Sequence, residues 1–132
     1  EIHLGVLPGT GGTQRLGRVL GRSKAMQLML EGTKMTPQEA LDAGLVNKVI
    51  EAESAEAFLQ AVSDYARAFT PPRGASMAAG RIKRALTSGL EMGLEQGLAL
   101  ERELQAELFA SSDAIEGLTA FTQKRPPQFQ GR

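Results

Sequence analysis

The sequence predicts a mainly α-helical protein with short β segments. Apolar residues recur at helical spacing through most of the 132 residues, whereas period-two alternation occurs at residues 1–6 and residues 45–50 read as a short strand. The chain is 42% hydrophobic and 23% charged, as in ordinary folded proteins. Its length suits one domain or about half of a larger one.

The two short β segments are expected at residues 1–6 and 45–50. In the first, Ile2, Leu4 and Val6 alternate with less apolar residues, as they would in a half-buried strand. This strand should end at the turn-forming run that starts at Pro8 and contains three glycines. The second segment follows Gly44 and reads as a short strand.

Helix signals follow the glycine-rich turn. A helix is expected over residues 12–20, and Gly21 should end it. Ser23 can cap a second helix that ends before Gly32. This second helix places three apolar side chains on one face: Met26, Met29 and Leu30.

The clearest helix start lies at residues 36–39, Thr-Pro-Gln-Glu, which combine a capping box with proline at the first helical position. Gly44 should close this short helix. A longer helix begins at Ser54, and its apolar side chains should form one buried stripe. The stripe consists of Phe58, Ala61, Val62, Tyr65 and Phe69.

The run Thr70-Pro71-Pro72 ends that helix and is the best internal boundary, so we divide the chain into residues 1–70 and 71–132. Beyond it, helices are expected at about 75–87, 94–110 and 113–125. Asp113 and Glu116 should open the last one. The polar or proline-bearing residues 51–57 and 126–132 should vary most in conformation.

The expected helix 94–110 has more apolar surface than two short neighbours can cover. Its large apolar residues occupy more than one face: Leu94, Leu98, Leu100, Leu104, Leu108 and Phe109. A partner subunit or a further domain should cover them.

Composition excludes several kinds of function. The formal charge is zero, which argues against nucleic acid or an anionic membrane as a main partner. The chain has no cysteine and one histidine, so we expect neither a metal site nor a Ser-His triad. The absence of cysteine fits a reducing compartment, and we expect a cytoplasmic protein. No apolar run is long enough to cross a membrane.

From the residues alone, the candidate site residues have simple structural explanations. The glycine-rich loop has Gln14 where a dinucleotide fingerprint needs glycine, and it lacks the Gly-Lys-Ser/Thr of a phosphate loop, so it reads as a tight turn. Glu1 reads as a solvated acid. Lys124 and Arg125 would offset the dipole of the last helix, and Phe121 would pack on a neighbour. His3 is assigned no role.

Three motifs in order resemble those of the crotonase (enoyl-CoA hydratase/isomerase) superfamily. They are EIHLGVLPGTGGTQRL at residues 1–16, ALDAGLV at 40–46, and EGLTAF at 116–121 followed by Lys124-Arg125-Pro126. The resemblance spans the chain but only the C-terminal half of a family member. It implies the tail of the crotonase α/β spiral core over residues 1–70 and a helical trimerisation segment over 71–132.

The resemblance also implies site residues. Family members bind an acyl-CoA thioester and stabilise its enolate. Glu1 matches the second of two glutamates that hydratases use, and the amide at Gly9 helps to hold the attacking water. Leu7 and Pro8 fall on the wall of the acyl site. Phe121 and Lys124 match positions that reach the CoA of a neighbouring subunit.

The function implied is that of an enoyl-CoA hydratase, which adds water to 2-trans-enoyl-CoA. The oxyanion-hole amides and the first glutamate lie in the family's other half, so we expect the chain itself to be an inactive fragment. Alternatives are an isomerase or another acyl-CoA enzyme of the family, or a non-catalytic oligomerisation module. We expect a homotrimer or hexamer, and no metal or cofactor beyond the CoA thioester substrate.

Overall fold

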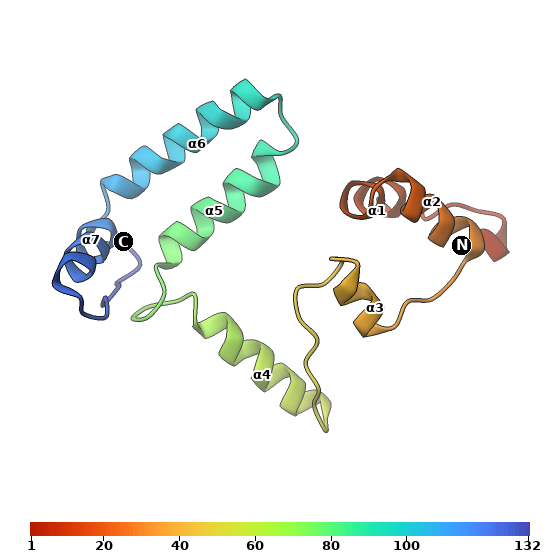
Figure 1. The fold of residues 1–132 in the computed structure, drawn as a ribbon, viewed down its shortest axis with the longest axis horizontal. Helices are drawn as coiled ribbons and strands as arrows, with labels where there is room; N and C mark the ends of the chain where they lie inside the picture. Colours follow the sequence, from red (N-terminus) through yellow and green to blue (C-terminus); the bar gives the residue numbers. More distant parts are fainter. The chain divides into compact units, whose positions relative to one another are not determined.

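The computed structural model describes residues 1–132, and every regular element in it is a helix (Figure 1). The helices are the 3-10 helix η1 (Ile2–Leu4) and the α-helices α1 (Gly12–Leu20), α2 (Arg22–Glu31), α3 (Pro37–Asp42), α4 (Ala55–Arg67), α5 (Ser76–Gly89), α6 (Leu94–Phe109) and α7 (Ser112–Gln123). The chain divides into two compact units, Glu1–Ala52 and Glu53–Arg132. None of the helices is long and apolar enough to cross a membrane.

Neither predicted β segment is present. Residues 2–4 form η1, in which the Leu4 amide donates to the Glu1 carbonyl at 2.9 Å and the Gly5 amide donates to the Ile2 carbonyl at 3.0 Å. Residues 45–50 contain no strand either. A strand is stable only when a neighbouring backbone pairs with it. Here the first amides of both segments donate to carbonyls of the same turn or of the turn just before it. The alternation of apolar residues at positions 1–6 is therefore not sufficient to predict a strand.

In the first unit, α1 packs on α2, and η1 lies against α2. The prediction of helix 12–20 ending at Gly21 is confirmed. The prediction that Ser23 caps α2 is wrong, because α2 begins at Arg22 with Gly21 at the cap. Gly32 ends α2 as expected: it has φ 63° and donates its amide to the Leu28 carbonyl.

The predicted capping box opens α3. The Glu39 amide donates to Thr36 Oγ1 at 3.2 Å, and the Thr36 amide donates to Glu39 Oε2 at 2.7 Å. That backbone hydrogen bond from Thr36, together with one from its hydroxyl, lowers the pKa of Glu39. After α3 the chain turns at Gly44, whose φ is 74°. Local capping chemistry therefore defines this helix without help from tertiary packing.

Helix α4 begins after Ser54, whose Oγ accepts the Ala57 amide at 3.1 Å, as predicted. The expectation that its apolar stripe is buried is wrong for this chain. Phe58, Tyr65 and Phe69 of that stripe are 44%, 49% and 48% exposed. The physical reason is that α4 makes no contact with another helix, so its amphipathic face has nothing to pack against.

Helices α5 and α6 form an antiparallel hairpin, and α7 packs on α6 (Figure 1). The two backbones approach closely at Gly97, where an added Cβ would lie 3.1 Å from the Gly89 carbonyl oxygen. An ion pair of 2.5 Å between Arg81 and Glu107 also joins the hairpin. Leu104 and Ala120 form the small core of this unit.

The surplus of apolar surface on α6 is confirmed. Leu104 is buried, but Leu94 and Phe109 are 78% and 63% exposed. The division of the chain at 52/53 groups α4 with the C-terminal helices, whereas the boundary expected from the sequence follows α4. The assignment of residues 1–70 to a spiral core stays a prediction.

The last helix begins earlier than expected. Ser111 is its cap and accepts the Ala114 amide at 3.1 Å, so the prediction that Asp113 and Glu116 cap it is wrong. Ser111, in extended conformation just before the first turn, takes that role instead. The two acids are thereby free to bond the chain that follows α7.

Candidate functional site

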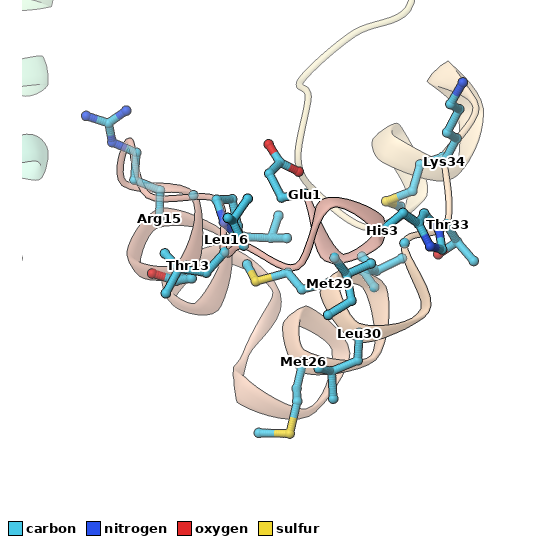
Figure 2. Close-up of a pocket in the computed structure, with 18 of the residues that line it drawn as sticks. Glu1, His3, Thr13, Arg15, Leu16, Met26, Met29, Leu30, Thr33 and Lys34 are labelled. Atoms are coloured by element: carbon cyan, nitrogen blue, oxygen red, sulfur yellow. The ribbon is translucent and has the colours of Figure 1, made fainter.

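The first unit has a broad apolar hollow of about 1300 Å³. Figure 2 shows η1, the glycine-rich turn, α1 and α2 around it. Met26, Met29 and Leu30 line it from α2, which agrees with the face predicted for them. Because its walls are mostly aliphatic and thioether groups, the hollow suits an apolar chain rather than a charged group.

Glu1 lies on the rim of this hollow. Its carbonyl accepts the amides of Leu4 and Val6 at 2.9 and 3.3 Å, which fixes the backbone from which its side chain projects. The side chain is exposed, and its carboxylate points away from Met26 and Leu30 of α2 (Figure 2). The structure thus presents one carboxyl group at the edge of an apolar surface.

The glycine-rich turn forms one side of the hollow. Leu7 and Pro8 line it, whereas Gly9 is not among the lining residues. Gly12 allows the start of α1 to approach the turn, because an added Cβ there would lie only 2.8 Å from Pro8 Cβ. The turn therefore needs a residue without a side chain at this point. It brings Leu7 and Pro8 to the same hollow as Glu1.

Phe121 and Lys124 belong to the second unit, at the end of α7. Phe121 is 83% exposed, so it does not pack in this chain as an ordinary core aromatic. Lys124 is also exposed and follows the last helical residue with φ 54°. The two residues are joined through the backbone, because the Lys124 amide donates to the Phe121 carbonyl at 3.2 Å.

Two acids on α7 hold the chain that follows it. Glu116 makes two hydrogen bonds with the Arg125 guanidinium, at 2.6 and 2.8 Å, and accepts the Gln128 amide at 2.7 Å. The hydrogen bonds from Arg125, followed by that from the Gln128 amide, lower the pKa of Glu116 to about 2. Arg125, expected to offset the helix dipole, instead pairs with Glu116, and its own pKa is raised.

Asp113 is buried, and its carboxylate accepts the amides of Gln130 and Gly131 at 2.7 and 2.8 Å. The Phe129 amide donates to the Pro72 carbonyl at 2.9 Å, which ties the chain end to the segment before α5. The expectation that residues 126–132 vary in conformation overlooked these bonds. The only sequence signal for these bonds is the pair of acids Asp113 and Glu116, which is followed by a proline-bearing segment.

Sequence reasoning also missed several residues around the hollow. His3 was assigned no role, but it lines the hollow and its Nε2 would lie 2.7 Å from a Cβ added at Gly32. Lys34 and Met35, which follow α2, line the hollow too. Figure 2 shows the Arg15 and Lys34 side chains pointing outward on opposite sides. His3, Lys34 and Met35 reach the hollow because the chain turns at Gly32, and no periodic pattern in the sequence reveals that they line it.

The arrangement offers an apolar surface that suits an aliphatic chain, with one carboxyl group on its rim. No group of three His, Cys, Asp or Glu side chains is placed to hold a metal ion.

Comparison with known proteins gives one family. The family model described as enoyl-CoA hydratase/isomerase matches residues 1–132. The 2,3-dehydroadipyl-CoA hydratase of Escherichia coli K12 is 44% identical over 133 residues, covering 100% of this chain and 50% of that protein. The mitochondrial enoyl-CoA hydratase of Pongo abelii is 37% identical and is covered over 43% of its length.

Solved structures agree with this family. The crystal structure of an enoyl-CoA hydratase from Geobacillus kaustophilus HTA426 has a TM-score of 0.88 and 46% identity, covering 100% of this chain and 48% of that one. The chain thus spans about half the length of the curated relatives it matches. Its match to the family model over all 132 residues, together with these identities, shows that the chain belongs to the enoyl-CoA hydratase/isomerase family.

Proposed function

We propose that this chain is part of an enoyl-CoA hydratase, a lyase that adds water to 2-trans-enoyl-CoA thioesters. The observation that carries the proposal is the position of Glu1 on the rim of the apolar hollow, beside the glycine-rich turn. Relatives named as hydratases support hydration over isomerisation, because 2,3-dehydroadipyl-CoA hydratase and mitochondrial enoyl-CoA hydratase match nearly the whole chain.

In the proposed reaction the oxygen of water bonds to the β carbon of the enoyl group, and the electrons of the double bond pass to the thioester as an enolate. A proton then adds to the α carbon. Glu1 takes part in moving these protons together with a second carboxyl, and the Gly9 amide helps to hold the water. Leu7 and Pro8 form part of the acyl wall. The reaction consumes only water and thioester, so it needs no resident cofactor.

The second unit is proposed to contact CoA through Phe121 and Lys124. An exposed aromatic ring can stack on adenine, and an ammonium group three residues away can neutralise a phosphate. By family resemblance this CoA belongs to a neighbouring subunit. The exposed apolar faces of α4 and α6 need a partner subunit or a further domain to cover them, and assembly into a homotrimer or hexamer is one way to provide that cover.

We propose that residues 1–132 alone turn over no substrate, because the enolate-stabilising amides and the first glutamate belong to the other half of the family's fold. Loss of one such amide donor alone costs about 3–4 kcal/mol of transition-state stabilisation. The activity assay therefore uses a hybrid enzyme, in which residues 1–132 follow the amino-terminal half of the E. coli relative. Hydration of crotonyl-CoA is followed by loss of its absorbance.

Glu1→Gln in the hybrid enzyme should lower kcat by about 10²-fold or more, as expected for loss of a general acid or base. Glu31→Gln is the matched control, since it makes the same change on an exposed glutamate at the end of α2. Retained hydration in Glu1→Gln would remove Glu1 from the mechanism. A folded hybrid enzyme without hydration would favour a non-catalytic oligomerisation module.

A further inference from the structure

The turn that ends α7 has an unusual backbone at Lys124. Lys124 is the one non-glycine residue of the chain with positive φ, at 54°. The Lys124 amide donates to the Phe121 carbonyl at 3.2 Å, and the Arg125 amide donates to the Ala120 carbonyl at 3.1 Å. Glycine is the usual residue at such a helix end because it lacks a Cβ. A side-chain restraint on this turn would offset the cost of a left-handed conformation at lysine.

The side chain of the next residue supplies that restraint. Arg125 folds back along α7 and pairs in two places with Glu116, which lies two turns earlier. Its Nε also donates to Gln123 Oε1 at 2.8 Å. Two parallel hydrogen bonds fix the plane of a guanidinium as well as its position. The chain on the far side of Lys124 is thus fastened to the helix that precedes it.

Glu116 also fastens the chain further on. Its Oε1 accepts the Gln128 amide at 2.7 Å, so one carboxylate holds residues 125 and 128 at once. The carboxylate of Glu116 neutralises the charge of Arg125, whereas the Lys124 ammonium makes no ion pair in the structure. The cation available at this helix end is therefore Lys124, three residues after the exposed Phe121.

We propose that Glu116 and Arg125 are positioning residues, whose ion pair locks the turn at Lys124 and so presents Lys124 and Phe121 together to CoA. This inference rests on the proposed function, in which those two side chains contact CoA. The pair acts through the backbone turn and touches no ligand itself. Breaking it should release the turn without removing either contact group.

The first test is made on the 132-residue chain by NMR. Glu116→Gln should weaken the strong intraresidue amide–Hα cross-peak that positive φ gives at Lys124, and should speed hydrogen exchange at the Gln128 amide. Glu107→Gln is the matched control, because it breaks the ion pair with Arg81 between α5 and α6 and leaves α7 intact. An unchanged Lys124 cross-peak in Glu116→Gln would overturn the proposal.

The second test measures steady-state kinetics in the hybrid enzyme with crotonyl-CoA. Glu116→Gln should raise KM about tenfold with kcat unchanged, as should Lys124→Gln, and the double variant should be no worse than Lys124→Gln. Exchanging the charges, Glu116→Arg with Arg125→Glu, should restore part of the loss. Glu107→Gln should keep the wild-type KM.

The two tests separate the two ideas. If Lys124→Gln leaves KM unchanged, the proposed CoA contact fails, while the NMR result still decides whether the ion pair locks the turn. If Lys124→Gln raises KM and Glu116→Gln does not, the CoA contact stands and the positioning role is refuted.

Discussion

Replacing Gly32 by alanine tests the contact that holds η1, and with it Glu1, against the end of α2. An alanine Cβ at this position would lie 2.7 Å from His3 Nε2 and 2.9 Å from Ile2 Cγ2. Both distances are far below van der Waals contact. The residue also has φ 63°, which a side chain disfavours.

The loss of unfolding free energy in Gly32→Ala has two parts, backbone strain and overpacking. A matched substitution at a second glycine separates them. Gly44 has φ 74°, and an added Cβ there meets nothing within 4 Å. Gly44→Ala should therefore cost only the backbone strain, about 1–2 kcal/mol. Gly32→Ala should cost the same strain plus about 1–3 kcal/mol for overpacking against η1. The difference between the two variants measures the contact between Gly32 and η1.

Urea unfolding of the 132-residue chain, followed by amide NMR signals of α2, provides the free energies. A further variant, His3→Ala in the Gly32→Ala background, should recover part of the difference, because it removes the atom nearest to the new Cβ. Equal destabilisation by Gly32→Ala and Gly44→Ala would refute the reasoning. It would mean that η1 does not rest on α2 and that the position of Glu1 is not set by this contact.

Gly74→Ala should destabilise the second unit by about 2–3 kcal/mol in urea unfolding, because its Cβ would overlap the backbone of Phe69, which cannot move aside like a side chain. Gly80→Ala, in α5 with open space around it, should stabilise the same unit by about 0.5–1 kcal/mol, and a loss of stability there would contradict the structure. Acid should loosen the segment after α7. In the folded chain the pKa of Glu116 is about 2, below its ordinary value of 4.5, so the stabilisation from its bonds to Arg125 is complete above about pH 4.5 and is lost as pH falls toward 2. Protection of the amides near residue 128 against exchange, taken relative to the intrinsic exchange rate at each pH, should fall over that interval, and Glu116→Gln should abolish this fall.

The local signals in the sequence determined most of the helices. Thr36 and Ser54 mark helix starts that the structure has, and glycines 21 and 32 mark ends, since caps and positive φ act within a few residues. The motif resemblance predicted Glu1 and Leu7 as site residues; both line the hollow, and their roles stay predictions. Capping and turn signals act within a few residues of the chain, so they can be recognised in the sequence itself.

Tertiary structure alone decided which patterns are satisfied. The alternation at Ile2, Leu4 and Val6 is compatible with a strand, but pairing needs a second backbone, and the amides bond locally instead. The stripe at Phe58 and Tyr65 is amphipathic in sequence yet exposed, because burial depends on what packs against it. Bonds between residues far apart in sequence, such as that from the Phe129 amide to the Pro72 carbonyl, follow from how the chain folds back. The preferences of single residues for helix, strand or turn do not encode such contacts.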